Sequence, residues 1–399
     1  MGYETYRIAD LIDEIAMGPF GSNIKVSCFV DSGVPVLNGS NLEGFSLSEK
    51  TFRYVTRKKA DSLNKANAHR GDIVITHRGT LGQIVFIPQD SKYDRYVISQ
   101  SQFRVRCNDK VLPEYLVYYF HTPIGQHKLL SNASQVGVPA LARPSSTFQQ
   151  IEVVLPELSI QKCVVEIIST IQKKIVNNQE LNDNLYEMVN AYYTSLFKEN
   201  DCEMTTVGNY AERIYSGGTP MTSNAAYWNG TFGWFSSGET RNRFVISTEK
   251  TITQAGIDNS STKLATKYDI VMASAGQGFT RGQTSMLLID TYVNQSVIVI
   301  KSERNILPYL FWNLANRYDE LRAISDSSSI RGSLTTKMIA AFEIPLAKAQ
   351  SLQAFADFAW SVIHQIENNL LENERLTALR DSLLPKLMSG EIDVSDIQL

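Results

Sequence analysis

The chain has 399 residues, which is long enough for at least two hydrophobic cores. Its 43% apolar and 20% charged residues exclude a fibrous or wholly disordered protein. No apolar run is long enough to span a membrane, and the amino terminus lacks the apolar segment of a signal peptide, so we expect a cytoplasmic protein. Four widely separated cysteines have no zinc-ligand spacing, and we expect them to be reduced thiols.

The net charge of −3 conceals an uneven distribution along the chain. Residues 1–150 contain 17 basic and 13 acidic side chains, and residues 202–345 contain 13 and 12, so the acidic excess lies in the segments between and after them. Within 53–106, eleven basic side chains face four acidic ones, an excess of seven. This local excess suits a phosphate-binding surface, although a solvated loop and strand edge would have the same composition.

The sequence contains an internal repeat. Gly71-Asp72-Ile73-Val74 matches the segment 268–271 at an offset of 197 residues, and Leu112-Pro113 matches Leu307-Pro308 at an offset of 195. Glu152 then matches Glu343 at an offset of 191. A slowly shrinking offset indicates small deletions within one duplicated unit of about 195 residues.

Each copy has the same order of predicted elements. A stretch rich in β-branched and aromatic residues, interrupted by Gly, Asn and Ser, predicts a compact α/β domain at 1–152 and again at 201–343. A long helix is predicted after each domain, within 153–200 and 344–399. We therefore expect an α+β fold of two tandem α/β domains joined by two long helices, which form an antiparallel coiled coil with internal pseudo-two-fold symmetry.

Both predicted helices carry a heptad seam, in which apolar residues recur alternately four and three positions apart. The first seam consists of Val164, Ile168, Ile171, Ile175, Asn178, Asn182, Leu185, Val189, Tyr192 and Leu196. The second consists of Phe355, Ala359, Val362, Ile366, Asn369, Asn373, Leu376, Arg380, Leu383 and Leu387.

Each seam holds two asparagines at matching places, and a buried asparagine is best explained as fixing the register of a coiled coil. If the helices pack antiparallel about a pseudo-two-fold axis, Asn178 meets Asn373 and Asn182 meets Asn369. Parallel packing would instead place Asn178 opposite Asn369. The alternative is that all four asparagines are exposed on helices that drift from their seam.

In the first domain, polar side chains that suit DNA occur in three places. His77 and Arg78 follow a buried strand, and an arginine there either binds guanine in a bidentate fork, holds a phosphate or forms an internal ion pair. A run of three adjacent cations is expected to contact phosphates, and an Asn-Gly-Ser-Asn segment suits base edges or an ordinary turn. The predicted DNA-binding residues are Lys25, Asn38, Ser40, Asn41, Arg57, Lys58, Lys59, His77, Arg78 and Arg95.

In the second domain, Ser236 and Glu239 align with Asn38 and Asn41, and a glutamate can accept a hydrogen bond from cytosine. The predicted DNA-binding residues are Ser236, Glu239, Arg241, Arg243, Gln277, Thr280 and Arg281. With a smaller basic excess, this domain should grip phosphate less strongly. Trp228 and Trp234 are expected to pack in a core rather than to stack on an unpaired base.

No pattern for catalysis is present. The glycine cluster between Gly276 and Gly282 fails the dinucleotide spacing and lacks the lysine of a phosphate loop. The five histidines show neither metal-ligand spacing nor a nucleophile motif. We therefore expect a protein that is not an enzyme and that binds no metal.

The motifs resemble those of the DNA-specificity subunits of type I restriction-modification systems. In the first copy they are GPFGSNIK (18–25), VPVLNGSN (34–41) and GDIVITHRGTLG (71–82). In the second they are YSGGTP (215–220), AYW (226–228) and GWFSSGE (233–239), and the chain closes with LRDSLLPKLMSGEIDV (379–394). One departure is that the segment 275–278 stands where the first copy has the more basic 77–79.

The resemblance implies a non-catalytic subunit whose two target-recognition domains each bind one half of an interrupted, asymmetric site in double-stranded DNA. The helices would set the spacing and dock two modification (methyltransferase) subunits, and ATP-driven restriction subunits would join the complex. S-adenosylmethionine and ATP would bind to these partners, with no cofactor on this chain. Two other classes stay open: an enzyme that acts alone, and a coiled-coil adaptor of another phage-defence assembly whose globular ends bind protein.

Overall fold

The computed structural model describes residues 2–19, 23–134, 137–197, 203–276, 278–327 and 332–395. Contacts between residues divide the chain into two compact units. Unit 1 comprises Met1–Lys173 and Leu376–Leu399, and unit 2 comprises Lys174–Arg375. Each unit contains one copy of the repeat together with part of both long helices.

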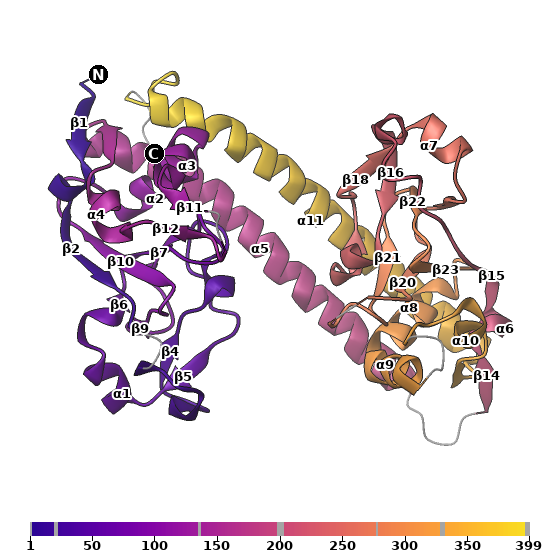
Figure 1. The fold of residues 1–399 in the computed structure, drawn as a ribbon. Helices are drawn as coiled ribbons and strands as arrows, with labels where there is room; N and C mark the ends of the chain where they lie inside the picture. The colour runs from indigo at the N-terminus through magenta and orange to yellow at the C-terminus, as the bar shows by residue number, and fades with distance from the viewer. Residues whose placement is uncertain are drawn as a thin grey trace. The chain divides into compact units, whose positions relative to one another are not determined.

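Unit 1 is built on two sheets (Figure 1). The first has the order β2(Ile12–Met17), β10(Gln102–Cys107), β7(Ile73–Thr76), β8(Ile84–Phe86), and all its neighbours are antiparallel. The second has the order β3(Phe29–Val30), β5(Arg53–Val55), β4(Val34–Val36), β9(Arg95–Val97), β6(Asn67–His69). Short pairs join β1(Glu4–Arg7) to β13(Glu152–Leu155) and β11(Ala133–Ser134) to β12(Ala140–Leu141). The helices of this copy are α1(Arg57–Ser62), α2(Pro113–His121), α3(Pro123–Leu130) and α4(Pro144–Gln149).

Unit 2 repeats this plan. Its first sheet has the order β15(Ala211–Ser216), β23(Val297–Ser302), β20(Ile270–Ala273), β21(Thr284–Leu287), β17(Phe244–Val245). Its second has the order β18(Lys250–Ile252), β16(Trp228–Phe235), β22(Thr291–Val293), β19(Lys263–Ala265), and β14(Met204–Thr206) pairs with β24(Glu343–Pro345). The helices are α6(Val207–Tyr210), α7(Gln254–Asp258), α8(Leu307–Asn316), α9(Tyr318–Ser327) and α10(Thr336–Ala340).

The strand pairing confirms the repeat. In each second sheet one pair is parallel, Val36 opposite Val97 in unit 1 and Phe235 opposite Val293 in unit 2. The turn before the central strand of each first sheet also matches, because Gly71 and Tyr268 share a left-handed backbone with φ of +85° and +76°. A non-glycine residue rarely adopts this conformation, so the turn is maintained although its glycine is lost.

The long helices are α5(Leu158–Leu196) and α11(Ala349–Ser389). Each begins several residues later than the predicted boundaries of 153 and 344, because a strand of the preceding domain occupies those positions. The second helix also ends before the chain does. The division into units crosses both helices, since each helix contributes apolar side chains to both cores.

The helices pack antiparallel along the predicted seam. In unit 2, Asn178 Nδ2 donates to Asn373 Oδ1 at 2.9 Å, and Asn369 Nδ2 donates to Asn182 Oδ1 at 2.7 Å. In unit 1, Arg380 donates to Gln172 Oε1 at 2.9 Å. As the residue number rises along α5, the number of its partner falls along α11, as the antiparallel alternative predicts. That the asparagines fix the register stays a prediction.

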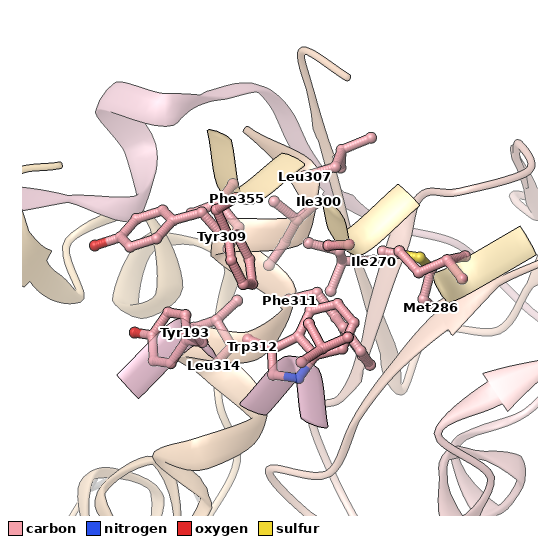
Figure 2. Packing of buried hydrophobic residues seen from close by; sticks show 14 of the residues in the cluster. Tyr193, Ile270, Met286, Ile300, Leu307, Tyr309, Phe311, Trp312, Leu314 and Phe355 are labelled. Carbon is pink, nitrogen blue, oxygen red and sulfur yellow. The ribbon is translucent and has the colours of Figure 1, made fainter. Parts of the chain in front are cut away.

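The core of unit 2 joins sheet and helices. Figure 2 shows Phe311 and Trp312 of α8 packed among Tyr193, Ile270, Ile300 and Phe355. Trp312 also stacks on Tyr186 of α5, with 5.5 Å between the ring centroids. The predicted core position of Trp234 is confirmed, because its side chain is buried and its Nε1 donates to Gly218 O. Trp228 lies edge-on to it, at 5.0 Å.

The core of unit 1 is formed in the same way. Phe103, Phe120 and Phe148 lie beneath α5 residues such as Val164 and α11 residues such as Leu384. Each domain is therefore packed onto the helix pair by shared apolar contacts. Across the described ranges, no helix combines the length and apolarity that crossing a membrane requires.

Candidate DNA interface

A capped 3₁₀ turn occupies the same place in both units. In unit 1, η4(Gly39–Leu42) is capped by Asn38, whose backbone N–H donates to Asn41 Oδ1 at 3.0 Å. In unit 2, η7(Ser237–Arg241) is capped by Ser236, whose backbone N–H donates to Glu239 Oε1 at 2.8 Å. This shared capping geometry confirms the predicted alignment of the two segments.

The same geometry corrects two predicted DNA contacts. Asn41 is 1% exposed and Glu239 is 3% exposed. Asn41 Nδ2 donates to the carbonyls of Ser48 and Thr51, and Glu239 Oε2 accepts from the backbone N–H of Glu249. Their polar atoms are occupied inside the domain, so both residues hold the turn rather than face a base. Asn38 and Ser40 remain exposed, and Ser236 is half-buried.

In each unit, the hairpin loop between two strands of the first sheet forms hydrogen bonds with the capped turn. These strands are β7 and β8 in unit 1 and β20 and β21 in unit 2. In unit 1, Gln83 Nε2 donates to Gly39 O at 2.9 Å, while Thr76 Oγ1 donates to Gln83 Oε1 at 3.0 Å. In unit 2, Thr240 Oγ1 donates to Gln283 Oε1 at 3.4 Å. We call the capped turn and this hairpin loop the recognition surface of each unit. It comprises Gly39–Leu42 and the loop between β7 and β8 in unit 1, and Ser237–Arg241 and the described part of the loop between β20 and β21 in unit 2. These contacts of Gln83 and Gln283 were not predicted from the sequence. The repeated Gly-Gln pairs at 82–83 and 282–283 are the sequence signal that could have indicated them.

The loop of unit 1 begins with His77 and Arg78. The His77 ring is half-buried and its Nε2 lies 3.1 Å from Gln100 O. Burial lowers the pKa of this imidazole, so it is neutral at physiological pH. Arg78 is exposed, and its backbone forms an isolated bridge to Ala140. The loop therefore presents the guanidinium of Arg78 to solvent and holds His77 beneath it.

The other predicted cations of unit 1 are mostly free. Arg57 and Lys58 are exposed at the start of α1, which Thr56 caps by accepting from the backbone N–H of Lys59 at 3.2 Å. Lys25 is exposed at the start of another 3₁₀ turn. Within the described ranges no ion pair involves these three cations, Lys59 or Arg78. Arg95 differs, because it pairs with Asp61 at 2.6 Å.

The predicted arginines of unit 2 are paired within the unit. Arg241 pairs with Glu249, and Arg281, whose side chain is 11% exposed, pairs with Asp326. Arg243 lies 3.7 Å from Asp183 and stacks over the Tyr186 ring at 4.2 Å. These carboxylates offset the positive charge of three arginines that we predicted to contact DNA. Thr280 is half-buried, and the remaining candidate, Gln277, lies outside the described residues.

A polar cavity of about 380 Å³ opens beside the recognition surface of unit 2. Arg241, Arg243, Gln283 and the loop residue Phe279 line it together with α5, which contributes Asn190. The long helix therefore borders the surface directly.

In each unit, a residue just after the capped turn forms a cation–π pair with a long helix. Phe45 and Arg243 occupy equivalent positions, since their carbonyls accept from the N–H groups of Phe86 and Met286. In unit 1, Arg380 of α11 lies 4.8 Å from the Phe45 ring, and in unit 2 the domain supplies the cation and the helix supplies the ring of Tyr186. The two pairs are chemically inverted, since the helix supplies the cation in unit 1 and the ring in unit 2.

Among the described residues, no group of three or more His, Cys, Asp or Glu side chains is arranged to hold a metal ion. Burial raises the pKa of the Cys107 thiol to about 12.

Comparison with known proteins gives the same picture as the repeat. The profile of the type I restriction modification DNA specificity domain matches residues 2–187 and again 201–378. The chain is 27% identical over 270 residues to the EcoR124I/EcoR124II specificity subunit of Escherichia coli, covering 63% of this chain and 63% of that protein. It is 21% identical over 412 aligned positions to the HindI specificity subunit of Haemophilus influenzae, covering 81% and 87%.

Among solved structures, the fold resembles the type I restriction-modification S subunit from M. genitalium, with a TM-score of 0.60 and 16% identity over 97% of this chain and 96% of that one. At this identity the likeness concerns the fold alone. The family profile, in contrast, covers both copies of the repeat and most of both long helices. On that match, the chain belongs to the family of type I restriction-modification DNA-specificity subunits.

Proposed function

We propose that each unit binds one half of a bipartite sequence in double-stranded DNA through its recognition surface. The observation that carries this proposal is the duplication: the same capped turn and hairpin loop occur twice, each joined to a long helix. Exposed amides, hydroxyls and guanidinium groups suit base edges and phosphates. Two different surfaces on one chain suit an asymmetric site with two unlike halves.

In this proposal the helix pair is the scaffold of a larger complex. Its exposed faces dock two modification subunits, which bind S-adenosylmethionine and methylate the DNA, and ATP-driven restriction subunits join them. The chain itself selects the site and catalyses nothing. Such a complex acts in the cytoplasm, where its DNA substrate lies.

The experiment is a genome-wide map of methylated adenines in cells that carry this chain and its modification partner. The expected result is one interrupted motif whose two halves differ. An uninterrupted motif would contradict the assignment of one half to each unit. No methylation, together with no sequence-dependent DNA binding by the assembled complex, would favour an adaptor that binds protein.

A further inference from the structure

The hairpin loop of unit 2 is three residues longer than that of unit 1. Both loops are closed in the same way, because Thr76 N donates to Gln83 O and Ala273 N donates to Gln283 O, each at 3.0 Å. Between the corresponding glycines, the first loop runs over 79–82 and the second over 276–282. The additional residues carry Phe279, which has no aromatic counterpart in unit 1.

Helix α9 fixes the backbone of this longer loop. The Tyr318 hydroxyl donates to Phe279 O at 2.8 Å, and Arg322 donates to Gly278 O at 2.5 Å. Two residues after Phe279, Arg281 forms an ion pair with Asp326 of α9. Anchors on both sides hold the loop against α9, yet Phe279 is 83% exposed.

At 83% exposure the Phe279 ring buries little apolar area, so it contributes little to the stability of the unit. Its neighbours indicate what covers it. Phe279 lines the same cavity as the amide side chains of Gln283, Asn190 and Asn316. A ligand that offers hydrogen-bonding base edges to these amides and flat apolar faces to the ring is a DNA duplex.

We propose that Phe279 is a wedge that inserts between two stacked bases in the half-site bound by unit 2. The insertion partly unstacks one base step, and that half-site is then selected for a step that unstacks easily. This inference rests on the proposed function and adds a contact that unit 1 cannot make. It also gives unit 2 a source of affinity other than its arginines, whose charge is offset by ion pairs within the unit.

The test uses the complex of the full chain with its modification subunits and a duplex that contains the mapped methylation site. Each base of the half-site bound by unit 2 is replaced in turn by 2-aminopurine, whose fluorescence rises when it is unstacked. Binding affinity is measured for the wild type, Phe279→Ala and Phe279→Trp. The matched control is Met204→Ala, an exposed apolar residue on β14, away from the recognition surface.

The modification subunit flips the adenine that it methylates out of the duplex in every variant, so that position is left out of the comparison. At the other positions we expect fluorescence to rise at one step with the wild type and with Phe279→Trp, but not with Phe279→Ala. Loss of one base–aromatic stack should weaken binding by about 5- to 100-fold, and Met204→Ala should bind like the wild type. Unchanged affinity of Phe279→Ala, or no fluorescence change at any of these positions, would overturn the proposal. So would loss of the modification subunits from Phe279→Ala in gel filtration, because Phe279 would then be a protein contact. If the wild type itself binds no sequence selectively, the proposed function fails as well, and the two failures are distinguished.

Discussion

Units 1 and 2 share one fold but distribute their charges differently. In unit 1, Arg57, Lys58 and Arg78 reach solvent without an ion-pair partner among the described residues. In unit 2, the arginines at the equivalent surface are held by Glu249, Asp183 and Asp326. In the proposed function, the fold determines which side chains face the DNA, and local ion pairs determine how much of their charge is available to it.

The largest expected difference between the units concerns a buried aspartate. Asp72, with a side chain 1% exposed, lies 2.9 Å from Arg106 and 3.4 Å from Arg104, which is also buried. Its counterpart Asp269 lies 3.1 Å from Lys301, whose side chain is 26% exposed, and burial raises the Asp269 pKa above its ordinary value. Removing Asp72 thus leaves a buried arginine short of a partner, whereas removing Asp269 leaves a lysine that water can solvate.

We expect Asp72→Ala to lower the free energy of unfolding by about 3 kcal/mol, because Arg104 loses a buried partner. The loss is no larger because Glu14 remains as a second partner of Arg104. Asp269→Ala should cost about 1.5 kcal/mol. Hydrogen exchange measured by mass spectrometry reports each unit separately, and increased exchange should be confined to the unit that carries the substitution. Equal losses in the two variants would contradict the difference in burial.

The next effect concerns salt. Each phosphate contact adds about 0.9 to the slope of log affinity against log salt concentration. Replacing Arg57, Lys58 and Lys59 by Gln should therefore reduce the slope of the assembled complex by about 2.7, and lower its affinity at low salt about 10- to 100-fold. The matched variant, Arg241→Gln with Arg243→Gln, should change the slope by less than about 1, because internal carboxylates already neutralise these charges. Equal changes in slope would show that these ion pairs open on DNA binding.

The units also differ in the polar layers of their helix pair. Asn178 donates both to Asn373 and to Glu372, whereas the layer of unit 1 is formed by Arg380 and Gln172. Asn178→Leu should destabilise the chain by about 1–3 kcal/mol, because Asn373 Oδ1 loses its buried donor. Leucine at both positions should restore stability and loosen the register.

Register is measured by carbodiimide crosslinking of Lys174 to Glu372, which form an ion pair at 3.1 Å in the native register. We expect this crosslink to weaken in the double Leu variant relative to the wild type. Gln172→Leu is the control, since Arg380 keeps its contacts with Asp381 and Phe45. An undiminished crosslink in the double variant would remove the register role from the asparagines.

Much of this fold could be predicted because it depends on patterns along the chain. The repeat follows from matched segments, and the seam positions predict that Asn178 meets Asn373 once the helices are taken to run antiparallel. Each predicted helical segment begins several residues before its helix does, because apolar residues there form a strand paired with the start of the same domain. A strand and a helix start are hard to separate in a short apolar run.

The site was harder to predict than the fold. Asn41 and Glu239 have the chemistry of base contacts, but the same chemistry caps a turn, and only burial distinguishes the two. The ion-pair partners of Arg243 and Arg281 lie 60 and 45 residues away along the chain, so no local sequence pattern predicts these ion pairs. Phe279 was overlooked because an aromatic residue in a loop is unremarkable until its exposure is known.

The central claim is that each unit selects one half of the DNA site. The most direct test replaces residues 1–150 by the corresponding domain of another family member with a different target, and maps methylated adenines in cells that carry the chimera and the modification partner. We predict that one half of the motif changes to that of the donor while the other half stays as it was. A motif that changes in both halves, or in neither, would contradict the account.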